Sequence, residues 1–61
     1  MKLRFVCKVY DKNGDVFSVL PEGQKIEVLE VDKRTVKIQW AKEGGYKYGY
    51  LAHRQFMICC Q

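Results

Sequence analysis

Aromatic and basic side chains gather in the last third of this 61-residue chain. Tyr46, Tyr48 and Tyr50 stand at alternate positions, and His53 and Arg54 follow shortly after them. If this stretch is a strand, tyrosines two residues apart share one face of it. Exposed tyrosines offer a large contact area at low entropic cost, and their rings can stack on bases or sugars. These residue types therefore favour a binding surface over a reaction centre.

The side chains that could support catalysis lack partners in the sequence. His53 is the single histidine and Ser18 the single serine, so no serine, histidine and acid constellation can be assembled. Gly44-Gly45 is not followed by the lysine and hydroxyl pair of a phosphate-binding loop. We therefore interpret the chain as non-catalytic, with no cofactor, and His53 as either a polar surface group or a contact residue.

The three cysteines do not form a recognisable metal or disulfide pattern. Cys7 is distant in sequence from the adjacent pair Cys59 and Cys60, and an odd number is not a disulfide framework. A zinc site needs ligands at loop spacings that these residues and His53 do not supply. We expect thiols in a reducing compartment and no metal site, although the vicinal pair, if exposed, could be redox-active.

Composition limits the possible partners without selecting one. The formal charge of +4 could steer the chain toward phosphates, anionic wall polymers or an acidic protein, or could simply maintain solubility. The basic residues are spread along the chain, which weakens the case for nucleic acid. Lys8 and Asp11 interrupt the apolar start of the chain, and no stretch approaches the roughly 18 apolar residues of a membrane span. We expect a cytoplasmic protein with no membrane span.

The elements that must position the tyrosines are short strands. The clearest is Thr35 to Ala41, where Val36, Ile38 and Trp40 alternate with polar residues. Turn residues punctuate the chain at 11–15, at 21–23, at 32–34 and, with two glycines, at 42–47. The predicted strands are Lys2–Tyr10, Val16–Leu20, Lys25–Val31, Thr35–Ala41, Tyr48–Leu51 and Phe56–Cys60, with a 3₁₀ turn at 52–55.

Together these strands predict one all-β domain over residues 1–61, a small barrel of five to six short antiparallel strands. In the first strand, Leu3, Phe5, Cys7 and Val9 are expected to share one face. Trp40 is expected to pack in the core or at the barrel rim, and Tyr50 is equally compatible with packing or exposure. A glycine inside a strand, Gly49, suggests that another part of the chain approaches closely there.

Several segments resemble the SH3-like barrel, and most closely the bacterial SH3 family. They are Val9-Tyr10-Asp11, the stretch Leu20 to Leu29 (LPEGQKIEVL), Val36-Lys37-Ile38 and Gly49-Tyr50-Leu51. The resemblance implies a turn at Gly23, a close crossing of two sheets at Gly49, and core positions at Ile26, Val28, Val36, Ile38 and Leu51. It also implies that the first and last strands pair, which would bring Cys7 near Ile58 and Cys59.

This sequence departs from the branch of the SH3 family that binds proline-rich peptides. Tyr10 matches the first tyrosine of the peptide groove, but Lys12 replaces the second. Ala52 stands in place of the proline after the Gly-Tyr-aliphatic motif, and Gln55 in place of the following groove tyrosine. The tryptophan that begins the third strand of the family is Thr35 or Val36 here. A conventional groove for proline-rich ligands is therefore not expected.

The sequence leads to one preferred function and two alternatives. We expect a stand-alone module that recognises a protein or peptide through a tyrosine-rich basic face. Its candidate ligand-binding residues are Tyr10, Tyr46, Tyr48, Tyr50, His53 and Arg54. The alternatives are a barrel that binds nucleic acid and a domain that binds a bacterial cell-wall polymer.

Overall fold

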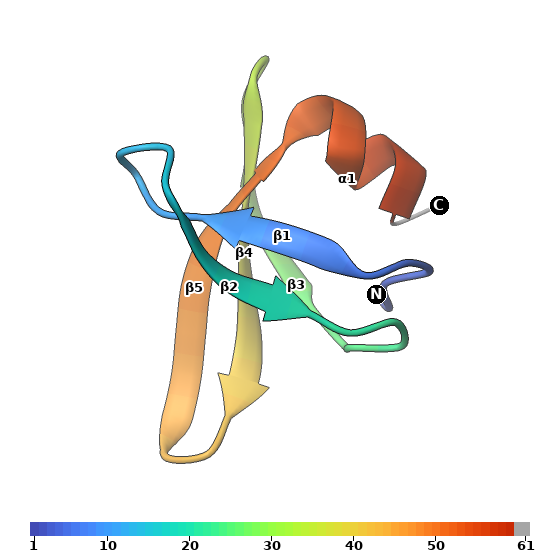
Figure 1. Ribbon diagram of the computed structural model, residues 1–61, viewed down its shortest axis with the longest axis vertical. Coiled ribbons are helices and arrows are strands. Elements are labelled where there is room, and N and C mark those ends of the chain that lie inside the picture. Colours follow the sequence, from blue (N-terminus) through green and yellow to red (C-terminus); the bar gives the residue numbers. More distant parts are fainter. Residues whose placement is uncertain (60–61) are drawn as a thin grey trace.

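A computed structural model describes residues 1–59 of the chain (Figure 1). Its elements, in chain order, are β1 (Cys7–Tyr10), β2 (Val16–Leu20), β3 (Glu27–Val31), β4 (Thr35–Lys42), β5 (Gly45–Ala52) and α1 (His53–Cys59). Within the described residues, five antiparallel strands form a single sheet in the order β2-β1-β5-β4-β3. The predicted all-β domain of short antiparallel strands is confirmed, with a short helix added at the end.

The sheet consists of two parts that cross at β1 and β5. The β1–β2 hairpin lies across the longer strands β4 and β5, and α1 lies near one end of the molecule (Figure 1). Tyr10 and Tyr50 are the paired residues where β1 meets β5. The register skips Phe17 in β2 and Leu29 in β3, so each outer strand of the sheet carries a bulge. Such bulges twist the outer strands and discourage pairing with further strands.

The predicted turns connect these strands with the expected backbone chemistry. At the β1–β2 turn, the carboxylate of Asp11 accepts hydrogen bonds from the amides of Asn13 and Asp15 (2.8 and 3.0 Å), and Gly14 has φ 89°. After Pro21, Gly23 has φ 86° and the amide of Gln24 donates to the Pro21 carbonyl. Positive φ is the conformation that glycine adopts without steric penalty, so these sequence signals fixed the turns.

The core lies on one side of β4 and β5, where the alternation of the sequence is followed closely. Val36, Ile38 and Trp40 of β4 are buried, and the residues between them are not. The buried hydrophobic residues are Leu3, Cys7, Val9, Leu20, Ile26, Val36, Ile38, Trp40, Leu51 and Cys59. Val28 is only partly buried, and the other core positions implied by the resemblance are buried. Trp40 is therefore a core residue, and its ring lies 6.2 Å from the ring of Phe17 between centroids, tilted by 32°.

The predicted first strand, Lys2–Tyr10, is wrong in its first half. Residues 1–3 instead pair with 23–26: Lys2 forms a bridge with Lys25, and the Leu3 amide donates to the Gln24 carbonyl. The chain then bends, so that the amide of Arg4 donates to the carbonyl of Cys59 at 2.7 Å. This bend breaks the alternation, so Phe5 is exposed whereas Leu3, Cys7 and Val9, which were predicted to share its face, are buried.

The predicted 3₁₀ turn at 52–55 and the predicted final strand Phe56–Cys60 are also wrong, because residues His53–Cys59 form the helix α1. Cys60, the last residue of that predicted strand, lies outside the described residues. Phe56 and Cys59, three residues apart, pack toward the core, while Met57 and Ile58 are exposed. A short apolar run does not distinguish a strand from a helix by periodicity. The N-terminal segment and the end of α1 nevertheless meet, through the hydrogen bond between Arg4 and Cys59.

The turn predicted at 42–47 is shorter in the structure. Strand β4 runs to Lys42 and β5 begins at Gly45, so only Glu43 and Gly44 remain between them. Gly44 and Gly45 both have positive φ, at 91° and 136°. Tyr46, which the sequence placed in this turn, therefore belongs to the same strand as Tyr48 and Tyr50. Within residues 1–59 no helix is long and apolar enough to cross a bilayer.

Candidate functional site

All four tyrosines of the chain lie on the outer face of the sheet, opposite the core. Tyr46, Tyr48 and Tyr50 alternate along β5 and pair with Ala41, Gln39 and Lys37 of β4, whose neighbours in sequence are the buried core residues. Tyr10 is paired with Tyr50 across β1 and β5, and paired residues of neighbouring strands share a face. We call Tyr10, Tyr46, Tyr48 and Tyr50 the tyrosine face.

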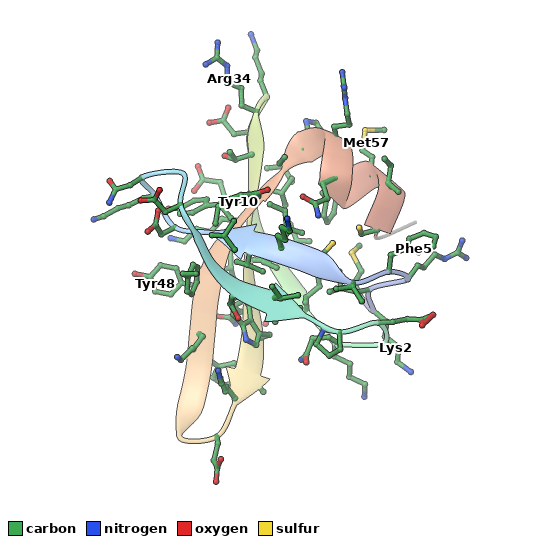
Figure 2. All side chains as sticks on the ribbon, viewed as in Figure 1. Lys2, Phe5, Tyr10, Arg34, Tyr48 and Met57 are labelled. Atoms are coloured by element: carbon green, nitrogen blue, oxygen red, sulfur yellow. The ribbon has the colours of Figure 1, made fainter. Side chains whose placement is uncertain are left out.

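Exposure differs along the tyrosine face in a graded way. Tyr46 and Tyr48 are 72% and 61% exposed, whereas Tyr10 and Tyr50 are half-buried where the two hairpins cross. Figure 2 shows Tyr10 near that crossing and Tyr48 projecting from β5 toward solvent. At one end of the face the rings of Tyr10 and Tyr50 are partly packed, and at the other end the rings of Tyr46 and Tyr48 project into solvent. Such a surface can hold a ligand against the partly packed rings and cover it with the projecting rings.

Two polar contacts hold the side chains beside the tyrosine face. The ammonium of Lys37 lies 4.9 Å from the centre of the Tyr48 ring, a distance at which a cation attracts the face of an aromatic ring. The amide of Gln39 donates to the carboxylate of Glu27 on β3 at 2.8 Å. These contacts continue the face from β5 across β4 to β3.

Three shallow hollows meet at Tyr50. The first, of about 390 Å³, is lined by Tyr10, Asp11, Lys12, Gly14, Arg34, Thr35, Leu51 and Ala52 as well as Tyr50. The second, of about 490 Å³, is lined by Asp11, Lys12, Phe17, Lys37, Tyr48, Gly49 and Tyr50. The third, of about 230 Å³, is lined by Glu30, Asp32, Thr35, Lys37 and Tyr50. Neighbouring hollows of this size around one aromatic ring can each receive a side chain of an extended ligand.

The charges that line these hollows balance. Three are acidic (Asp11, Glu30 and Asp32) and three are basic (Lys12, Arg34 and Lys37). The formal excess of +4 therefore lies elsewhere on the chain. A surface built for a phosphate backbone would concentrate basic residues, so the charge balance favours a ligand of mixed polarity over nucleic acid.

His53 and Arg54, predicted as part of the site, lie at the start of α1 and line none of these hollows. The backbone amide of His53 donates to the Arg34 carbonyl at 2.9 Å, and its Nδ1 lies 3.2 Å from the Lys33 carbonyl. The side chain thus fastens the helix to the β3–β4 turn. Arg54 is exposed on the outer side of α1.

Sequence reasoning missed the polar residues that surround the tyrosine face. The alternation in Thr35 to Ala41 puts Thr35 and Lys37 on the polar side of their strand, but nothing in the sequence placed them beside Tyr50. Asp11 and Lys12 come from the β1–β2 turn, and Arg34 from the β3–β4 turn. Only the crossing of the two hairpins brings these turns to the same ring. The outward alternation of Thr35, Lys37 and Gln39 was the one signal that could have found part of this set.

Within residues 1–59, no group of three or more histidine, cysteine, aspartate and glutamate side chains is arranged to hold a metal ion. Cys7 and Cys59 are buried in the core, so Cys59 is not the exposed thiol considered from the sequence, and Cys60 lies outside the described residues. Comparison of the chain with models of known protein families, with curated proteins and with solved structures gave no match.

Proposed function

We propose that this chain is a non-catalytic binding module that recognises a protein or peptide through the tyrosine face. The observation that carries the proposal is the gathering of all four tyrosines on one sheet face, where Tyr10, Tyr48 and Tyr50 line three neighbouring hollows. Aromatic residues in such positions dominate the free energy of many protein interfaces. The single histidine supports a non-catalytic role, because its side chain contacts the Lys33 carbonyl and lines none of these hollows.

The arrangement also supports kinship with the bacterial SH3 family as part of this proposal. Two antiparallel hairpins cross at Gly49, the glycine that the resemblance singles out, and Gly23 opens the segment that leads into β3. A module of this type, acting in the cytoplasm, would take its ligand across the hollows and not in a proline-rich groove. The substituted groove positions Lys12 and Thr35 line the same hollow as Tyr10.

A peptide selection followed by chemical-shift mapping tests the proposed function. Peptides selected from a random library on the immobilised chain should shift the backbone amides of Lys37, Tyr48 and Tyr50 in the NMR spectrum. Truncation of a central aromatic contact typically costs about 1–2 kcal/mol or more, so Tyr48→Ala should weaken peptide binding by about 5- to 30-fold. The matched control is Phe5→Ala, which removes an exposed aromatic ring from outside the tyrosine face.

The same experiment distinguishes the alternatives. If no peptide is selected above background, or if Tyr48→Ala and Phe5→Ala behave alike, the proposed function is wrong. Binding of oligonucleotides with an affinity that falls steeply with salt would assign the face to nucleic acid instead. Sedimentation with purified cell-wall material, lost in Tyr48→Ala, would assign it to a wall polymer.

A further inference from the structure

The helix α1 presents an unusual outer side. Arg54, Met57 and Ile58 are spaced three and four residues apart, so they lie on one helix face, and all three are exposed. Phe56 and Cys59 occupy the side that packs on the core. A surface helix ordinarily shows polar residues to solvent, but this one shows two large apolar side chains. Packing within the described residues does not require these side chains to be apolar, since more than half of each is exposed.

The N-terminal segment adds further apolar side chains beside this helix. The hydrogen bond from the Arg4 amide to the Cys59 carbonyl, at 2.7 Å, fixes the segment against the helix end. Phe5 and Val6 follow directly, and both are more than half exposed. Figure 2 shows Phe5 near the end of α1 and Met57 on the side of α1 that faces away from β1. We call Phe5, Val6, Met57 and Ile58, with Arg4 and Arg54, the terminal surface.

The charge around the terminal surface is predominantly positive. Residues 1–10 and 53–59 contain four lysines and arginines (Lys2, Arg4, Lys8 and Arg54) and no acidic residue. Lys25 adds to them, because it pairs with Lys2. Glu22 is an acidic residue beside this region, in the turn whose Gly23 amide donates to the Leu3 carbonyl, and it offsets only part of this charge. Two copies of the chain would repel each other through this surface, so its positive charge favours an anionic partner over a second copy.

We propose that the terminal surface docks on an anionic lipid membrane, with its apolar side chains inserted among the headgroups and its arginines against lipid phosphates. Exposed apolar side chains combined with basic residues are the combination that binds peripheral proteins to such membranes. A protein partner requires a complementary shape, whereas a lipid layer accepts protruding side chains without one. None of the residues of the terminal surface lines the hollows around Tyr50.

Vesicle sedimentation tests this proposal. The full chain should sediment with phosphatidylcholine vesicles that contain phosphatidylserine and much less with pure phosphatidylcholine vesicles, and added salt should weaken the binding. The double variant Met57→Ser, Ile58→Ser should lose about tenfold or more in affinity, because it removes apolar area that would be inserted. Arg4→Gln and Arg54→Gln should each lose about fivefold.

The matched control is the double variant Tyr46→Ser, Tyr48→Ser, which removes exposed rings from the tyrosine face and should sediment like the unmodified chain. Circular dichroism of every variant confirms that it is folded, as expected for exposed positions. The proposal is overturned if the unmodified chain binds neither vesicle or both equally, or if the control variant loses as much affinity as the Met57 and Ile58 variant. Failure to sediment, combined with binding of polyglutamate through Arg4 and Arg54, would assign the surface to an acidic protein instead.

Discussion

At the scale of single residues, Gly49 determines how closely the two hairpins approach each other. It is buried in β5, and a Cβ atom added to it would collide with the Cγ1 methyl of Val9 on β1 and lie 2.8 Å from the ring of Phe17 on β2. Its neighbours Tyr48 and Tyr50 point to the other side of the sheet. The crossing that builds the hollows around Tyr50 therefore depends on the missing side chain at this position.

We expect Gly49→Ala to destabilise the fold by about 2 kcal/mol, because overpacking of a filled core forces neighbouring side chains or backbone to shift. Urea denaturation followed by circular dichroism measures this loss as a lower midpoint with an unchanged slope. The tyrosine face should also be disturbed, seen as altered amide shifts at Tyr10 and Tyr50 in the folded variant.

Val9→Ala provides the control for this prediction. Alone, it removes methyl groups from the core and should destabilise the fold. Combined with Gly49→Ala, it makes room for the new Cβ atom. The double variant should therefore lose less unfolding free energy than the two single variants lose together. If the losses are strictly additive, the collision with Val9 does not limit the approach of the hairpins.

At the scale of elements, alternation of apolar and polar residues was sufficient where a strand is straight and half-buried. Thr35 to Ala41 was predicted with its inward residues Val36, Ile38 and Trp40, and the structure places each of them in the core. The turns at Gly14 and Gly23 were predicted from residues that tolerate positive φ, which is a local property. These features follow from neighbouring residues alone, and the sequence therefore contains the information for them.

Neighbouring residues do not predict the structure where a contact between distant parts of the chain determines it. Phe5 continues the alternation of Leu3 and Cys7, yet the hydrogen bond of Arg4 to Cys59 bends the chain and turns the ring outward. Residues 56–59 read equally well as a strand or a helix. The tyrosines were recognised as binding residues from their type, but their common face with Tyr10 depends on the pairing of β1 with β5.

The bridge between Lys2 and Lys25 places two like charges directly opposite each other. Such a pair destabilises neighbouring strands, whereas an opposite-charge pair stabilises them by about 0.2–1 kcal/mol. We therefore expect Lys2→Glu to raise the free energy of unfolding by about 0.5 kcal/mol at low salt, with the gain shrinking as salt screens the pair. Urea denaturation at low and high ionic strength measures both effects.

Lys47→Glu is the matched control, because it changes the net charge by the same amount but its partner across the sheet is Trp40, which is uncharged. An equal gain in both variants would mean that the reduction of overall charge, and not the bridge at Lys25, is responsible. A gain that persists unchanged at high salt would likewise contradict the electrostatic explanation.

At the scale of the whole molecule, one face of β4 and β5 stabilises the fold and the other carries the proposed binding surface. One face carries the core residues Val36, Ile38 and Leu51, and the other carries Tyr46, Tyr48 and Tyr50. The molecule is small, with a Cα radius of gyration of 10.4 Å. Domains of about 60 residues bury only about 60% of their unfolded surface, so each core side chain supplies a large share of the stability.

Leu51→Ala makes this dependence measurable. Leu51 is fully buried beside the half-buried Tyr50, and replacing a buried leucine with alanine usually costs about 2–5 kcal/mol. A chain of this length has a total stability of about 3–9 kcal/mol, so a large part of the variant population should be unfolded near physiological temperature. Thermal unfolding by circular dichroism measures this, and Val31→Ala, at an exposed position of β3, should leave the midpoint within a few degrees. If Leu51→Ala instead unfolds cooperatively near the original midpoint, the stability of the fold does not depend on the core beneath β5.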